Sequence, residues 1–273
     1  MKNEMQTTNT SLPATSAPPQ VSKILAADVV VPRLLLMQGT SDFVKDRKAT
    51  LGDMVRSTTA EKLGDPDKMI QIIPLAEPTP TWIIEFRQVG AQRWSFKGIE
   101  PRTALNDGLP WKFEADKDGK PLAAGQPSNF EWRRVKCLTL YALLPADIDA
   151  FRAEEEKAAR GEMPDISKAL TPIVISFRST SFKAGKEVIT FFTDVAQFRM
   201  PAWKFSIGLG CYLDKNDQGT YYVFKVDRKS TPVAKENLDK VEYWANIVAS
   251  TTLRVDEAGD EDDAQPGSGA GNF

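Results

Sequence analysis

One stretch of the chain, Trp203–Asp227, constrains the fold more than any other. It holds two runs rich in aromatic and β-branched residues, WKFSIGLGCYLDK and TYYVFKV, joined by NDQG. Two such runs around a short loop of Asn, Asp and Gly predict a β-hairpin. Side chains alternate along a strand, so Tyr222 and Phe224 share one face. Tyr221 and Lys225 lie on the other face, which is either a second buried surface or an exposed one that pairs a ring with a cation.

The periodicity elsewhere predicts a mixed α+β domain. Strands are expected at 51–55, 69–75, 81–89, 94–97, 129–144 and 172–178, and helices at 147–160, 181–198 and 233–251. Asp147 is the expected N-cap of the first helix and Gly161 its stop. Gly208 and Gly210 lie inside a predicted strand, where they indicate a bulge or a barrel bend. Short strands with long loops favour an OB-like, partly closed antiparallel β-barrel with inserted and C-terminal helices over a doubly wound sheet.

The two ends of the chain differ from its middle. Residues 1–27 are polar and contain proline, and residues 254–273 are acidic with little apolar content, so both are predicted to be disordered. Residues 28–253 are expected to form a single globular domain. No apolar run approaches the ~18–20 residues that span a bilayer, and the N-terminus lacks the apolar core of a signal peptide. These features predict a cytoplasmic protein without membrane contact.

Charge is distributed unevenly along the chain. The net charge is −2, yet residues 255–273 contain six acids and no Lys or Arg. Removing those six charges from the total leaves +4 on the rest of the chain. A mildly basic body with an acidic tail is the polarity expected of a nucleic-acid binder that carries its own electrostatic competitor.

Residues typical of catalysis and metal binding are scarce. The chain has no histidine, which removes the commonest general base and metal ligand. Cys137 and Cys211 fall in predicted strands without metal-ligand spacing, so they are expected to be buried thiols. No P-loop, dinucleotide-binding, GxSxG or HExxH motif occurs. We therefore expect no enzyme activity, no cofactor and no metal site, with a carboxylate-only Mg²⁺ nuclease as one alternative.

Aromatic and basic residues are interleaved through the predicted strands and loops, as in the pair Trp111/Lys112. Single-stranded DNA is held by cationic grooves for its phosphates and by flat rings on which bases stack. For any single ring, burial in the core is the alternative. The residues predicted to form such a surface are Trp82, Arg87, Trp94, Lys97, Trp132, Arg133, Arg134, Lys136, Arg178, Lys183, Lys204, Tyr221 and Lys225.

Several segments resemble phage-encoded single-stranded DNA-binding proteins. The opening VPRLLLMQGTSDFVKDRKATLGDMV, then LGD at 63–65, IIPL at 72–75 and TWIIEFR, resembles the start of such proteins, and GTYYVFKV with the helix after it resembles their close. The resemblance covers most of residues 28–250. It implies an OB-like core and a role in phage DNA replication, recombination or repair.

The acidic tail resembles the tails of bacterial and phage single-stranded DNA-binding proteins, which tend to end in a phenylalanine that docks on partner proteins. The corresponding residues here are Asp260, Glu261, Asp262, Asp263 and Phe273, although a Gly/Ser linker separates the acids from Phe273. The resemblance implies that replication or recombination proteins bind the tail. A phage interaction or transcription-accessory protein without a base-stacking surface is the second alternative.

Overall fold

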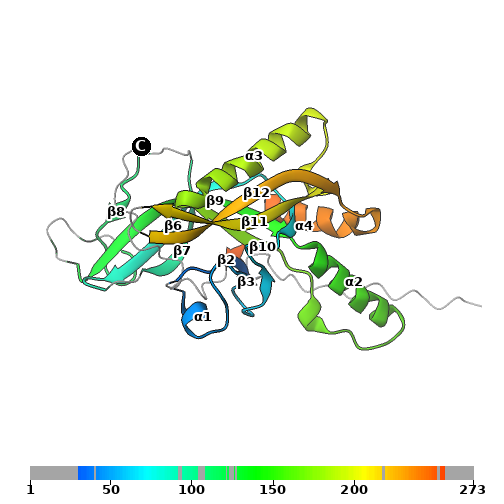
Figure 1. The fold of residues 1–273 in the computed structure, drawn as a ribbon, viewed down its shortest axis with the longest axis horizontal. Helices are drawn as coiled ribbons and strands as arrows, with labels where there is room; N and C mark the ends of the chain where they lie inside the picture. The colour runs from blue at the N-terminus through cyan, green and yellow to red at the C-terminus, as the bar shows by residue number, and fades with distance from the viewer. Residues whose placement is uncertain are drawn as a thin grey trace, which may run out of the picture.

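One strand, β9 (Phe130–Leu143), runs through the middle of the molecule and has partners on both of its edges (Figure 1). The computed structural model describes residues 30–39, 41–91, 94–103, 108–120, 122, 126, 128–216, 219–250 and 253–255. On one edge β9 pairs with β5 (Ile70–Pro74) and β6 (Thr79–Gln88), and on the other with β8 (Lys112–Phe113) and β10 (Ile173–Arg178). All four pairings are antiparallel. The 14 residues of β9 are long enough to belong to two groups of strands at once.

The described strands form an 11-stranded, mostly antiparallel sheet whose order is open. The order is β12 (Gly219–Pro232), β11 (Phe205–Asn216), β5, β9, β10, β2 (Arg33–Leu36), β3 (Met54–Arg56) and β4 (Lys62–Gly64), with β7 (Ser95–Pro101) beside β6. A separate parallel pair joins β1 (Val30–Val31) to β13 (Arg254–Val255). The helices are α1 (Asp42–Lys45), α2 (Pro145–Ala159), α3 (Phe182–Gln197) and α4 (Leu238–Ser250), with 3-10 turns at Ile166–Lys168, Ser179–Ser181, Ala202–Lys204 and Lys235–Asn237. This architecture confirms the predicted α+β class.

The main core lies between α3 and one face of the sheet. The apolar stripe of α3 packs onto residues from β2, β3, β5, β9, β10, β11 and β12. Its largest fully buried members include Phe177, Leu138, Leu140 and Ile72. Burying each such side chain contributes about 1.5–3 kcal/mol. This part of the molecule therefore holds the largest group of buried apolar side chains that stabilise the fold.

The side chain of Gln38 joins the end of β2 to β12, although these strands form no ladder. Gln38 Nε2 donates to Tyr222 O at 3.0 Å, and Gln38 Oε1 accepts from Tyr222 N at 3.0 Å. Ser181 Oγ accepts from Phe224 N, the next outward-facing amide of β12, at 3.2 Å. Nearby, a Cβ on Gly52, whose φ is +81°, would lie 2.6 Å from the Tyr222 ring. Side chains thus satisfy the outer edge of β12 where another strand would otherwise pair.

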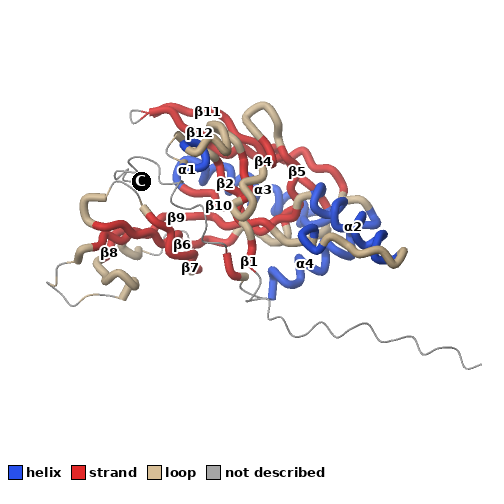
Figure 2. The backbone as a smooth tube through the Cα atoms, turned by 90° about the horizontal axis from the view of Figure 1, so that it is seen from below, coloured by secondary structure: helices blue, strands red, loops and turns tan. Residues whose placement is uncertain are grey.

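A second core fills an arm built from β6, β7, β8 and the first half of β9. Trp82, Ile84, Ala115 and Trp132 form it, with partly buried phenylalanines around them. Figures 1 and 2 show this arm at one end of the molecule and α2 with α4 at the other. The arm therefore holds an aromatic core of its own, apart from the core under α3.

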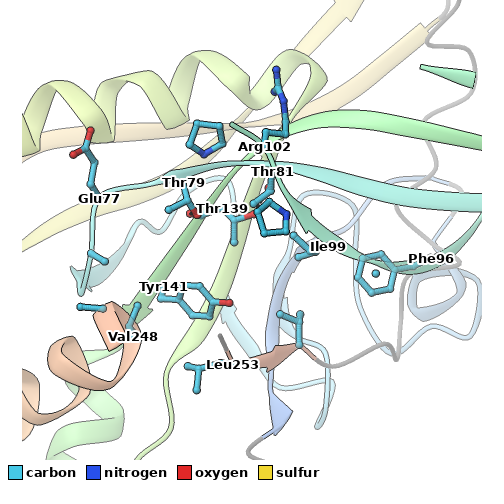
Figure 3. Close-up of a pocket in the computed structure, with 16 residues that line it drawn as sticks. Glu77, Thr79, Thr81, Phe96, Ile99, Arg102, Thr139, Tyr141, Val248 and Leu253 are labelled. Carbon is cyan, nitrogen blue, oxygen red and sulfur yellow. Dashed lines mark hydrogen bonds between the residues drawn. The ribbon is translucent and has the colours of Figure 1, made fainter. Parts of the chain in front are cut away.

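The sheet face turned away from α3 meets the C-terminal part of the chain. Val31, Val174 and Leu253 are buried together there, and Tyr141 and Val248 pack beside them. The packing leaves a cavity of about 570 Å³ between β6, β7, β9, the end of α4 and β13 (Figure 3). Its lining combines apolar side chains with several hydroxyls.

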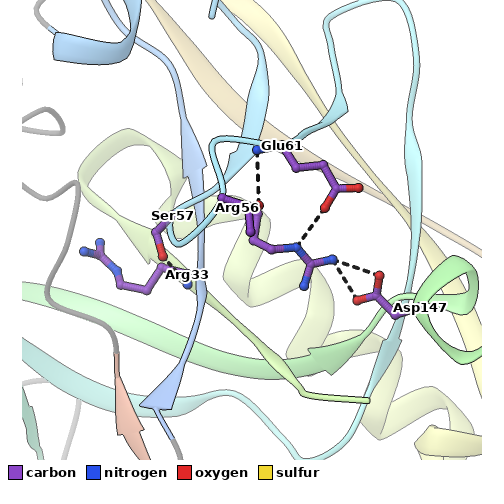
Figure 4. A network of polar contacts seen from close by, with 6 residues as sticks. Arg33, Arg56, Ser57, Glu61 and Asp147 are labelled. Carbon is purple, nitrogen blue, oxygen red and sulfur yellow. Dashed lines mark hydrogen bonds and ion pairs between the residues drawn. The ribbon is translucent and has the colours of Figure 1, made fainter. Parts of the chain in front are cut away.

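An arginine anchors α2 to the sheet (Figure 4). Arg56 Nη2 on β3 lies 2.8 Å from both carboxylate oxygens of Asp147, and Arg56 Nε donates to Glu61 at 3.1 Å. Asp147 was predicted as the N-cap, but α2 begins at Pro145, a residue preorganised for a first helical position. The carboxylate of Asp147 therefore lies in the first turn, where it holds β3.

The structure confirms several other predictions and corrects others. Both cysteines are buried free thiols, and the hairpin register shifts between Ser206 and Gly208, where a bulge was predicted. The helix expected at 181–198 ends at Gln197, and Phe198, the residue after it, is 73% exposed and does not join the core. Residues 254–273 were predicted to be disordered, and of these Arg254–Val255 form β13. Residues 1–27 and the rest of the tail lie outside the described residues.

We predict that Gln38→Met destabilises the fold. Methionine matches the glutamine in length but leaves Tyr222 N and O without their partner, so the free energy of unfolding should fall by about 1–3 kcal/mol. Urea denaturation measures this loss. Gln71→Met, at an exposed position of β5, is the matched control and should change stability by less than about 0.5 kcal/mol. Equal stability of the two variants would show that the bridge does not hold β12.

Candidate nucleic-acid interface

The register between β6 and β9 sorts the predicted binding residues onto two faces of the arm. Trp82 pairs with Lys136, Ile84 with Arg134, Phe86 with Trp132, and Glu85 with Arg133. Because alternate residues share a face, one face carries Trp82, Phe86, Trp132, Arg134 and Lys136. We call it the aromatic face. The opposite face carries Glu85, Arg87 and Arg133, and we call it the arginine face.

Two of the predicted stacking rings on the aromatic face are core residues. Trp82 is 1% exposed and Trp132 is 2% exposed. The Trp132 ring stacks on Phe86 with 5.1 Å between centroids, and its Nε1 donates to Asp116 O at 3.1 Å. A Cβ on Gly119, at φ +82°, would lie 3.0 Å from the ring. The loop after β8 therefore covers Trp132, and neither tryptophan presents a ring face to solvent as the sequence analysis expected.

The exposed ring on this side of the arm is Trp111. It is 47% exposed, and the Lys112 ammonium lies 4.6 Å from its ring centroid. Its carbonyl accepts from Arg134 N at 2.7 Å, which places Trp111 beside Arg134. Lys136, two residues further along β9 on the same face, is exposed. We call Trp111, Lys112, Arg134 and Lys136 the Trp111 surface.

Two of the three cations on the Trp111 surface have no carboxylate partner in the described part of the chain. Among the described residues, neither Lys112 nor Arg134 has an acidic side chain within ion-pair distance. The Arg134 guanidinium lies 4.4 Å from the Phe113 ring, which holds it in place by a cation–π contact. Arg134 Nε is buried and has no hydrogen-bond partner in the described part of the chain. The surface therefore presents an exposed ring beside two cations, Lys112 and Arg134, that no described carboxylate pairs.

On the arginine face, by contrast, the charges are paired. Glu85 is 3% exposed and accepts from Arg133 Nε at 2.5 Å and from Arg178 Nη1 at 2.7 Å. Arg87 Nε donates to Glu131 at 2.6 Å. Burial lowers the pKa of Arg133, and the adjacent Glu85 carboxylate opposes that shift. Glu85 therefore compensates two guanidinium groups, that of buried Arg133 and that of partly buried Arg178.

Trp94 completes this cluster. Its ring is 7% exposed and lies between two guanidinium groups, with Arg87 at 4.6 Å and Arg133 at 4.2 Å from the centroid. Cation–π contacts of this kind contribute about 0.5–2 kcal/mol each. The structure thus brings together four predicted residues, Arg87, Trp94, Arg133 and Arg178, as a paired and mostly buried cluster.

A third group lies between α3 and the hairpin. Lys183 and Lys225, both predicted, line a groove of about 230 Å³ with Thr180 and Tyr212. Tyr212 is 42% exposed and lies on β11 opposite Val223. This groove combines two cations with an accessible ring, which makes it a second, smaller candidate surface.

The remaining predicted residues are dispersed. Lys97 is exposed on β7, Lys204 lies 5.6 Å from the Trp203 ring, and Tyr221 is half-buried near the hairpin tip. The tail residues Asp260, Glu261, Asp262, Asp263 and Phe273 lie outside the described residues. Sequence reasoning noted the pair Trp111/Lys112 but did not include Trp111 or Tyr212 among the predicted binding residues. Trp111 lies in a predicted loop rich in Gly, Pro, Asn and Asp. Because loops run over the protein surface, an aromatic ring in such a loop could have been predicted to be exposed.

No other chemistry stands out in the described part of the chain. Its Cys, Asp and Glu side chains form no group of three that could hold a metal ion. Burial raises the pKa of Cys211 to about 11, and its thiol donates to Gly52 O at 3.1 Å. None of the described helices is long and apolar enough to cross a membrane.

Comparison of the chain with protein-family models, curated proteins and solved structures finds no match. The functional argument below therefore uses the geometry and charges of the surfaces described above.

We predict that Glu85→Gln strongly destabilises the arm. The substitution removes the charge that compensates Arg133 and Arg178 at a buried site, and breaking such pairs costs about 3–5 kcal/mol. Chemical denaturation measures the loss. The matched control is Glu131→Gln, whose carboxylate is 36% exposed and should contribute only about 0–1 kcal/mol. Similar small losses in both variants would contradict a structural role for Glu85.

Proposed function

We propose that this chain is a sequence-tolerant single-stranded DNA-binding protein. The observation that carries the proposal is Trp111, an exposed ring with a lysine ammonium 4.6 Å from its centroid and two further cations beside it. Stacking of a base on an aromatic side chain contributes about 1–3 kcal/mol and works with every base. Lys112, Arg134 and Lys136 supply positive charge for the phosphates on either side of a stacked base.

An exposed tryptophan favours a single strand over a duplex for a physical reason. In a duplex both faces of each base are covered by neighbouring bases, whereas an unpaired base can leave its stack and lie on a protein ring. Phosphate contacts alone would not make this distinction, because both forms carry phosphates. The ring therefore carries the preference for single strands, and the cations carry most of the affinity.

The paired arginines support the surface from beneath. Glu85, Arg133 and Arg178 tie β6, β9 and β10 together behind the aromatic face. A rigid support lowers the entropy lost when a flexible strand binds. The proposal includes the α3–hairpin groove, with Lys183, Lys225 and Tyr212, as a further contact with the DNA. It also includes an OB-like fold for the incompletely closed sheet. On the sequence resemblance alone, we propose a role in phage DNA replication or recombination.

We predict that Trp111→Ala weakens binding of a labelled single-stranded oligonucleotide. Loss of one stacking platform should reduce affinity about 5- to 150-fold, which corresponds to about 1–3 kcal/mol. The urea midpoint should stay the same because the ring is exposed. Fluorescence anisotropy titrations at one fixed ionic strength measure the affinity.

Phe198→Ala is the control for Trp111→Ala, because Phe198 is also an exposed ring, 73% accessible, but has no place on the Trp111 surface. It should bind as the unmodified protein does. A Trp111→Ala variant with unchanged affinity, or an unmodified protein that prefers a duplex of the same sequence, would overturn the proposal.

The acidic tail enters the proposal as an electrostatic competitor and a partner tether. Six negative charges linked flexibly to a body of +4 would be held near the cationic surfaces at an effective concentration on the order of millimolar. Single-stranded DNA would displace the tail and release Phe273 for a replication or recombination protein.

We predict that deleting residues 256–273 tightens single-stranded DNA binding at low salt. The advantage should disappear at high salt, because salt screens the competition between the tail and the phosphates. Titrations of the full and shortened chains at two ionic strengths test this. Equal affinities at low salt would remove the competitor role and leave only the tether.

A further inference from the structure

The cavity of about 570 Å³ has a polar floor and an open mouth (Figure 3). Thr81 and Thr139, which line its floor, are 6% and 2% exposed. Glu77, Thr79, Pro101 and Ala249 are solvent-exposed and lie where the cavity opens. The volume falls in the range of about 300–1,000 Å³ that holds small ligands. The space is thus accessible to a ligand from outside.

Apolar side chains line several sides of the cavity. Phe96 and Ile99 on β7 lie on one side in Figure 3 and Val248 on α4 with Leu253 on another, and Val255 is a further lining residue. The Arg33 guanidinium covers the Phe96 ring at 4.8 Å, which fixes that ring in place. A lining of this kind suits a flat, mostly apolar ligand.

The polar atoms that face the space are hydroxyls. Thr81 Oγ1 and Thr139 Oγ1 lie 2.7 Å apart, and Thr79 is the cross-strand neighbour of Thr139. The Tyr141 hydroxyl points toward the centre, and burial raises its pKa, so the phenol stays neutral. Each hydroxyl can donate or accept a hydrogen bond.

No charged head among the labelled lining residues points into the space. In Figure 3 the guanidinium of Arg102 and the carboxylate of Glu77 both point away from its centre. The Arg102 guanidinium instead lies 4.4 Å from the Trp82 ring, on the aromatic face. A charged ligand group would therefore find no counter-ion inside, so the cavity suits an uncharged ligand.

We propose that this cavity binds a nucleobase that a single strand turns out of its stack. A base is flat and uncharged, and its edge carries several hydrogen-bond groups that hydroxyls can satisfy whichever base is present. Arg102 connects the two sites, because its stem lines the cavity while its guanidinium lies over Trp82, the cross-strand neighbour of Lys136. The proposal rests on the proposed function, and it adds a second, enclosed base site to the exposed Trp111 surface.

The test compares two oligonucleotides of equal length on the full chain. One is oligo-dT, and the other has the same phosphates but an abasic site at every position. Methyl NMR follows Ile99, Val248 and Leu253 in the cavity, with Ile207 and Leu209 of the core under α3 as references. Oligo-dT should shift the cavity methyls and leave the references unchanged, whereas the abasic strand should shift neither set.

A paired substitution separates the cavity from the rest of the surface. Ala249→Trp places a large ring at the mouth from an exposed helical position, and should abolish the methyl shifts and weaken oligo-dT binding about 5- to 150-fold. Asn246→Trp adds the same bulk at an exposed position of α4 that does not line the cavity, and should change neither result.

Anisotropy titrations run beside the NMR experiment keep the two proposals distinguishable. If oligo-dT binds tightly but leaves the cavity methyls unshifted, the base site is wrong and the single-strand binding proposal stands. If decanoate shifts these methyls and oligo-dT does not, the cavity takes acyl chains and the base site is again wrong. If no single strand binds at all, the proposed function and the base site fall together.

Discussion

The two-sided pairing of β9 is the constraint on which the rest of the structure depends. A strand buried in a sheet must satisfy its backbone donors and acceptors on both edges, because an unpaired buried amide costs about as much as a lost hydrogen bond. β9 does so with different partners along its length: β6 and β8 flank its first half, and β10 and β5 flank its second. The strands of the arm and the strands under α3 therefore belong to one continuous sheet, joined through β9. A shift in the register of β9 would move the residues of both cores at the same time.

The same pairing decides which aromatic rings are available for binding. Trp82 and Trp132 stand on a face that the loop after β8 covers, so their large apolar areas stabilise the arm. Trp111 lies beyond that packing and keeps 47% of its surface in solvent. The cations differ in the same way. Arg133 and Arg178 form ion pairs with Glu85, whereas Lys112 forms none with a carboxylate in the described chain. The proposed binding residues are thus those that the core does not require.

Local patterns predicted the elements better than they predicted the surface. The hairpin, its bulge at Gly208 and the apolar stripe of α4 follow from alternation, glycine placement and helical spacing, which are local properties. Burial of Trp132 depends on Gly119 and Asp116, more than ten residues away, and no local pattern encodes that approach. The short strand β2 was missed because Pro32 interrupts its apolar run, and its partner β10 is about 140 residues distant. The pairing of Glu85 with Arg133 and Arg178 likewise needed the register of three strands.

The charge pattern of the two faces has a consequence for specificity. Paired guanidinium groups on the arginine face cannot neutralise many phosphates, since each already has a carboxylate partner and salt-linked affinity depends on the number of phosphates contacted. Among the described residues, Lys112 and Arg134 beside Trp111 and Lys183 and Lys225 in the α3–hairpin groove have no carboxylate partner, and the cavity floor offers neutral hydroxyls. The proposed phosphate contacts, the open stacking ring and the enclosed neutral pocket therefore occupy separate places on the fold. None of these three elements distinguishes one base from another, because rings stack on any base and hydroxyls both donate and accept. A binder built from them would discriminate by the flexibility of the strand and not by its sequence.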